Sequence, residues 1–228
     1  MNKIYKLTLA VFFSALLTVT ANAGTIGFGA TASGGSVHTN GSEVIARDAN
    51  DAAGQANPSG GATGRHEEIN LASFFVEYIF DNGAAIGIDH VPGEASLGSK
   101  TTTRTPSADA GTTTVTQKAA AEVRDMNMVY LEAPVVGPIF VTAGLASVDV
   151  NTQETLGTGA AYANVSVLGY MAGVGLKMNL GDHFYIKASG TYTDFEEINL
   201  VATGTTNVIH INADVDIAQA KAAIGYKF

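Results

Sequence analysis

The chain has 228 residues, of which 46% are hydrophobic and only 14% charged, and its formal net charge is −9 at pH 7. The acidic balance excludes the basic surface on which nucleic-acid binding depends, and the absence of cysteine excludes a disulfide framework. After residue 23 no apolar run approaches the roughly 18 residues of a transmembrane helix. A transmembrane β-barrel stays possible, because each of its strands gives only a weak signal.

Residues 1–23 have the three parts of a secretory signal peptide. Two lysines precede the apolar run LTLAVFFSALLTV, and the small-x-small sequence Ala21–Ala23 follows it. The run is too short to span a bilayer as a helix, although an N-terminal membrane anchor is the alternative interpretation. We therefore expect an exported protein that is cleaved near Gly24, with residues 24–228 forming a single domain.

Apolar residues alternate with small or polar residues through most of the remaining chain. This period of two is typical of β-strands that have one apolar face, and helical periodicity is hard to find. The alternation predicts eight strands, at residues 25–33, 69–80, 84–91, 122–133, 139–150, 165–178, 183–193 and 217–228.

Short and long connections between these strands alternate strictly. Three are tight turns, at Asp81–Gly83, Val135–Pro138 and Asn179–Asp182. The four long polar connections are Asn40–Arg65, Gly93–Ala121, Thr152–Tyr162 and Glu196–Thr206, and the Thr-rich part of the second could instead extend a hairpin. In an up-and-down meander, this order puts every tight turn at one end and every long loop at the other.

The composition of the two strand faces separates a barrel from a β-sandwich. The faces opposite the apolar ones carry Gly, Ser and Thr with few charges, which suits the narrow interior of eight strands better than a water-facing sheet. In lipid, the first and last strands must pair, because unpaired edge groups cost several kcal/mol each. The sequence therefore predicts an all-β, closed, antiparallel, up-and-down, eight-stranded transmembrane β-barrel over residues 24–228.

The end of the chain carries the most specific signal. It reads AAIGYKF, with Ile224, Tyr226 and Phe228 in the outward phase of the last strand. This resembles the C-terminal signature of bacterial outer-membrane β-barrels, and the whole pattern resembles the small OmpA/OmpX/OmpW-like barrels. The resemblance implies a monomer in the Gram-negative outer membrane, surrounded by its lipid, with these three residues read by the barrel-assembly machinery. The chain departs from many such proteins in having no Trp.

Five charged residues fall in the inward phase of the predicted strands. They are Glu77, Asp89, Asp125, Lys187 and Lys221. A charge inside a narrow barrel needs a partner or water. Either these residues form compensating ion pairs that plug the lumen, or they line a polar path and act as its gate.

No motif predicts catalysis, a metal or a cofactor, so none of these is expected. His38, His90 and His210 fall near the loop ends of their strands, but no two histidines have the spacing of a metal site. We expect an envelope protein with a structural role, polar external loops and a charge-filled lumen. A narrow, porin-like passive channel for small solutes is the alternative, and an adhesin or a rim-site enzyme is a third class.

Overall fold

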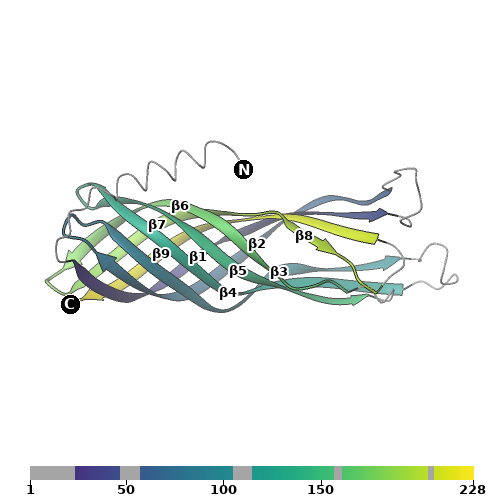
Figure 1. Cartoon of the computed structure of the whole chain (residues 1–228), viewed down its shortest axis with the longest axis horizontal. Helices are drawn as coiled ribbons and strands as arrows, with labels where there is room; N and C mark the ends of the chain where they lie inside the picture. The colour runs from purple at the N-terminus through teal and green to yellow at the C-terminus, as the bar shows by residue number, and fades with distance from the viewer. Residues whose placement is uncertain (1–23, 47–56, 105–114, 157–160, 205–207) are drawn as a thin grey trace.

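The computed structural model describes residues 24–46, 57–104, 115–156, 161–204 and 208–228 (Figure 1). The expected signal peptide, residues 1–23, lies outside the described residues. None of the described residues belongs to a helix long and apolar enough to cross a membrane. The strands are β1 (Thr25–Ala46), β2 (Asn57–Ile79), β3 (Ala85–Arg104), β4 (Val115–Val136), β5 (Ile139–Leu156), β6 (Val165–Leu180), β7 (Phe184–Phe195), β8 (Ile198–Val201) and β9 (Val208–Lys227).

Eight of these strands form a closed antiparallel ring. Each strand from β1 to β6 pairs with the strand that follows it, β7 pairs with β9, and β9 also pairs with β1 along the length of that strand. The short strand β8 pairs only with the outer part of β9 and does not belong to the ring. The predicted all-β, eight-stranded up-and-down barrel is confirmed, with the predicted pairing of its first and last strands.

The tight turns gather at one end of the barrel, where the C-terminus also lies (Figure 1). At the first turn, the Gly83 N–H donates to the Phe80 carbonyl at 2.8 Å and the Ala84 N–H donates to Asn82 Oδ1 at 3.0 Å. Gly83 has φ 84°, a left-handed conformation that glycine adopts at low cost. These local bonds explain why the Asn-Gly sequence reverses the chain between β2 and β3.

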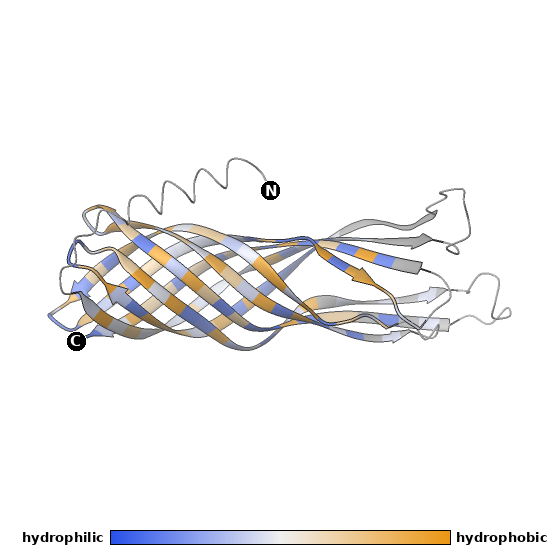
Figure 2. Ribbon diagram, in the orientation of Figure 1, coloured by the Kyte–Doolittle hydropathy of each residue, from blue (hydrophilic) through white to orange (hydrophobic). Residues whose placement is uncertain are grey.

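Strands continue into three of the four predicted long loops, and the fourth, Glu196–Thr206, contains the short strand β8. β3 runs to Arg104 and β4 starts at Val115, and their ladder includes the pair Thr101↔Lys118. The Thr-rich sequence favours strand here, as the hairpin alternative predicted. In the same way β1 continues to Ala46 and pairs with β2 beyond Gly41. Within the barrel itself, apolar and polar residues alternate along the strands (Figure 2).

The pairing of β2 with β3 is interrupted. Their ladder contains only six pairs, from Ile79↔Ala85 to Phe74↔His90, although both strands continue outward and pair on their other sides. Beyond this point β1 and β2 separate from β3 and β4 at the right of Figure 1.

The sequence explains where the ladder stops. Continuing the register would place Pro92 opposite Ala72, and Pro92 has no N–H to donate. The next residue, Gly93, has φ 105°, and the β3–β4 register shifts between Val91 and Glu94. Pro92 and Gly93 therefore interrupt the hydrogen bonding between the outer parts of β2 and β3, and we call this unpaired stretch of the wall the lateral gap.

Candidate functional site

A buried ion cluster crosses the lumen near the tight-turn end. Lys187 Nζ donates to Glu77 Oε2 at 2.6 Å and to Glu132 Oε1 at 2.8 Å. Lys177 Nζ donates to Glu77 Oε1 at 3.3 Å, and Tyr130 Oη donates to Glu77 Oε2 at 2.7 Å. Four different strands, β2, β4, β6 and β7, supply these five residues, which we call the ion cluster.

Aromatic rings pack around the ion cluster and keep water away from it. The Lys187 ammonium lies 4.7 Å from the centre of the Phe75 ring, and the Lys177 ammonium lies 4.7 Å from that of Tyr185. The side chain of Glu77 is 0% exposed and that of Lys187 is 7% exposed. With two acids and two lysines, the cluster is neutral, so it satisfies its own charges and fills this level of the lumen.

The structure places the predicted inward charges in different surroundings. Glu77 and Lys187 meet in the ion cluster. Asp89 is buried and Lys221 is half-buried, and both line a neighbouring cavity, where Lys221 Nζ lies 3.8 Å from Met128 Sδ.

Asp125 does not join the other predicted inward charges, although it is among the lining residues of the outer part of the lumen. Asp125 is exposed, with φ 47°, at a point where the β4–β5 register shifts between Arg124 and Asn127. The phase of β4 points Met126 and Met128 inward, and Asp125 falls in the opposite phase.

Sequence reasoning missed three members of the ion cluster, Tyr130, Glu132 and Lys177. The phase of Glu132 is that of Met126, Met128 and Tyr130, whose large apolar side chains were expected to face outward. Lys177 alternates with the outward residues Leu176 and Met178, so its phase was the signal that could have revealed it.

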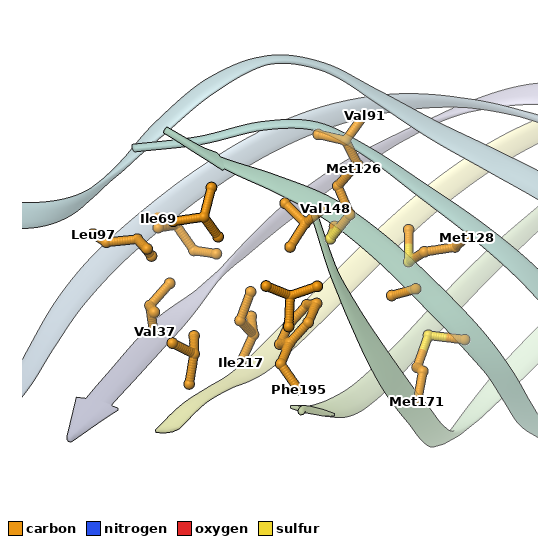
Figure 3. Close-up of a cluster of buried hydrophobic side chains, with 14 of the residues drawn as sticks. Val37, Ile69, Val91, Leu97, Met126, Met128, Val148, Met171, Phe195 and Ile217 are labelled. Carbon is orange, nitrogen blue, oxygen red and sulfur yellow. The ribbon is translucent and has the colours of Figure 1, made fainter. Parts of the chain in front are cut away.

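The outer half of the lumen is apolar, contrary to the expected small and polar interior. Its side chains enclose a space of about 590 Å³, part of which is open to solvent. Glu94, Arg124 and Asp125 are the charged residues among its lining, and Arg124 pairs with Glu94 at 2.8 Å. We call this space the apolar cavity. Its apolar lining includes Val37, Ile69, Leu71, Val91, Leu97, Met126, Val148, Val150, Val167, Phe195, Ile198, Val215 and Ile217, most of which appear in the cluster of Figure 3.

The apolar cavity lies beside the lateral gap. Among its lining residues, Ile69 and Leu71 belong to the part of β2 that does not pair with β3. Val91, Gly93 and Leu97 belong to the part of β3 that does not pair with β2. The two strand segments that fail to pair are therefore the segments that line the cavity on this side.

The rim histidines lie in separate settings. His38 Nδ1 is 3.1 Å from Asp216 Oδ2, and the His38 ring stacks on that of His66 with centroids 4.4 Å apart. His90 Nδ1 lies 2.8 Å from Asn127 Oδ1, and His210 is exposed on β9. Within the described ranges, no group of three or more His, Asp or Glu side chains could hold a metal ion.

The C-terminal aromatics form an external cluster at the tight-turn end. Tyr226 contacts the rings of Phe28, Phe184 and Phe228, with centroids 5.1–5.8 Å apart. Phe228 is 74% exposed and Ile224 is 55% exposed, and both share the outward phase of β9.

The strand ladder itself defines the class of protein, a closed eight-stranded antiparallel β-barrel. No protein-family model and no curated protein sequence matches this chain.

Several solved structures resemble the barrel at low sequence identity. The outer membrane protein OprG from Pseudomonas aeruginosa is 15% identical, with a TM-score of 0.44, and the match covers 88% of this chain and 96% of OprG. Ail, the attachment invasion locus protein of Yersinia pestis, is 14% identical, with a TM-score of 0.39 and coverage of 89% and 99%. The outer membrane protease OmpT from Escherichia coli is 10% identical, with a TM-score of 0.44 and coverage of 91% and 99%. Likenesses this distant carry no argument about the function of this chain.

Proposed function

We propose that this protein is a monomeric outer-membrane barrel that admits small apolar molecules from outside and releases them sideways into the membrane. The outward faces of the strands support the membrane location. On β9 the outward residues from Ala218 to Phe228 are all apolar or aromatic. At about 3.3 Å per residue and a strand tilt of about 40°, this face is about 25 Å tall, which matches the apolar band of an outer-membrane barrel.

The lateral gap begins at the outer edge of this apolar band, the edge farther from the tight turns. On β2 the outward residues change from Phe74 and Ala72 to Asn70, and on β3 from Ile88 to His90. The ladder ends at the pair Phe74↔His90, at the same level. A molecule that leaves the apolar cavity through the gap would therefore meet the outer boundary of the hydrocarbon region.

The ion cluster argues against passage straight through the barrel. Opening that level to water would separate Lys187 from two carboxylates in an environment where all three side chains are less than 10% exposed. Separating a buried ion pair costs several kcal/mol. The single observation that carries the proposal is the arrangement of three features. The apolar cavity lies beside the lateral gap, and the ion cluster fills the lumen on its tight-turn side.

The proposal is tested by restoring the interrupted ladder. In the double variant Pro92→Thr with Gly93→Val, both residues favour strand and position 92 regains its N–H. The assay measures uptake of the apolar dye 1-N-phenylnaphthylamine into asymmetric vesicles whose outer leaflet is lipopolysaccharide. Wild-type protein is expected to accelerate uptake, and the double variant is expected to lose most of that acceleration.

A matched control is Pro138→Thr, which changes a proline in a tight turn far from the gap. Its uptake should equal that of wild type. Equal uptake by wild-type protein and protein-free vesicles would contradict the proposal, and would favour the purely structural role in the envelope.

Two further expectations belong to the same proposal. Export and recognition of Ile224, Tyr226 and Phe228 by the barrel-assembly machinery would bring the chain to the outer membrane. The outward phase of Ile224 and Phe228 and the aromatic contacts of Tyr226 are compatible with that role.

A further inference from the structure

A second, polar cavity lies between the apolar cavity and the ion cluster. It encloses about 460 Å³, part of which is open to solvent. Three of its lining residues, Tyr130, Glu132 and Lys187, belong to the ion cluster. Its hydrogen-bonding side chains also include Thr31, Asp89, Thr142, Ser189, Thr191 and Lys221.

Two methionines connect the lining of the polar cavity with the apolar cluster. Met128 and Met171 line the polar cavity, and both also pack in the apolar cluster. Figure 3 shows them at one end of that cluster, with Leu97 at the other. A methionine side chain is unbranched and adapts its shape easily, so this part of the lining can rearrange around a ligand.

Polar atoms in this cavity lack partners within the described part of the chain. Asp89 Oδ1 and Thr191 Oγ1 have no hydrogen-bond partner, although Asp89 is only 6% exposed and Thr191 only 8%. The ammonium of Lys221 contacts Met128 Sδ, which is a weak acceptor. Buried polar groups in folded proteins are almost always satisfied by protein, water or ligand, so these atoms mark a place for a polar guest.

The chemistry of these atoms selects an uncharged guest. Asp89 accepts a hydrogen bond, Lys221 donates one, and Thr191 can do either. A hydroxyl group both donates and accepts hydrogen bonds. It also adds no charge beside Asp89 and Lys221, whose opposite charges already balance. A carboxylate would be repelled by Asp89, and an ammonium would be repelled by Lys221.

We propose that the polar cavity binds the hydroxyl head of a small amphiphile whose apolar chain lies in the apolar cavity. This inference rests on the proposed function and names its substrate class, an apolar chain that ends in an alcohol. Met128 and Met171 would move aside to join the two cavities around the ligand.

The test compares two isomers, 1-nonanol and 1-methoxyoctane, which have the same atoms but differ in the hydroxyl donor. Each displaces 1-N-phenylnaphthylamine from the refolded barrel held in amphipol. Wild-type protein should bind nonanol about ten-fold more tightly than the ether, because a buried acceptor left unpaired is costly. Nonanoate should bind more weakly than nonanol.

The double variant Asp89→Asn with Lys221→Met removes both charges, so no unpaired buried ion remains. It should retain dye binding and lose most of the preference for nonanol. The control Thr193→Val changes an inward residue of the same strand as Thr191 that lines neither cavity, and it should keep the full preference. A heat-dependent gel shift verifies that each variant forms the closed barrel.

Each other result overturns the inference. Equal affinities for the two isomers would mean that the polar cavity holds water only. Tightest binding of nonanoate would mean an anion site, and a preference that survives the double variant would place the head elsewhere. Failure of wild-type protein to bind the dye would overturn the proposed function as well.

Discussion

Replacing Lys187 by methionine tests how the ion cluster contributes to stability. In Lys187→Met, Glu132 loses its contact at 2.8 Å, while Glu77 keeps Lys177 and Tyr130. Removing one partner of a buried pair costs about 3–5 kcal/mol, because the other charge is left uncompensated. Since Glu77 retains two partners, we expect the low end of this range, a loss of about 3 kcal/mol in the free energy of unfolding.

A second variant separates the cost of the unpaired charge from the loss of the lysine itself. Lys187→Met combined with Glu132→Gln leaves the neutral pair of Glu77 and Lys177, and we expect a loss of only about 1 kcal/mol. Lys227→Met, which removes a half-buried lysine outside the ion cluster, serves as the control and should change stability by less than about 0.5 kcal/mol.

The assay is urea unfolding of the barrel refolded into phospholipid vesicles, followed by far-ultraviolet circular dichroism. The chain has no Trp, so tyrosine emission provides the second probe. If Lys187→Met lies within about 1 kcal/mol of wild type, or if the double variant is no more stable than the single one, the reasoning from buried ion pairs is refuted.

Two further predictions concern packing and assembly. In Gly225→Ala the new Cβ would clash with the Tyr185 ring, so we expect the free energy of unfolding in urea to fall by about 1–3 kcal/mol, and adding Tyr185→Leu should partly restore it. Equal stability of Gly225→Ala and wild type would contradict the close contact. Phe228→Ala should lower the yield of folded barrel in the outer membrane of cells several-fold, as measured by heat-dependent gel shift, while refolding of purified protein into vesicles stays near wild type. Loss of refolding in vitro would instead indicate that Phe228 acts through stability alone.

The strand rhythm could be predicted because it depends on local signals. Alternation set the strands, and the three tight turns carry glycines that adopt positive φ, such as Gly83 and Gly181. The closure of β9 on β1 followed from the need to pair both edges in lipid.

The lining of the lumen could not be predicted from alternation alone. The sequence shows which residues share a face, but not which face turns inward when both carry apolar residues. On β4 the large side chains of Met126, Met128 and Tyr130 point inward, so Glu132 was missed, and Asp125 is exposed rather than buried with the other charges. The positive φ of Asp125 depends on residues that are distant in the sequence, so no local sequence pattern predicts it.

The residues that interrupt the β2–β3 ladder, Pro92 and Gly93, are visible in the sequence. Their effect on the barrel wall could be recognised only from the strand register. A proline beyond a predicted strand is an ordinary loop signal. It interrupts a wall only because β3 continues to Arg104 and because the pair Phe74↔His90 aligns it with β2. The apolar cavity depends in turn on side chains from strands far apart in the chain, which pairing brings together.

The measurement that tests lateral release most directly is dye uptake through a gap that can be locked and unlocked. Continuing the β2–β3 register by two residues places Ala72 opposite Pro92, and the chain has no cysteine of its own. In the variant Ala72→Cys with Pro92→Cys, oxidation should abolish the accelerated uptake of 1-N-phenylnaphthylamine into lipopolysaccharide-coated vesicles, and a reductant should restore it. Unchanged uptake in protein that gel analysis shows to be fully cross-linked would contradict release through the gap.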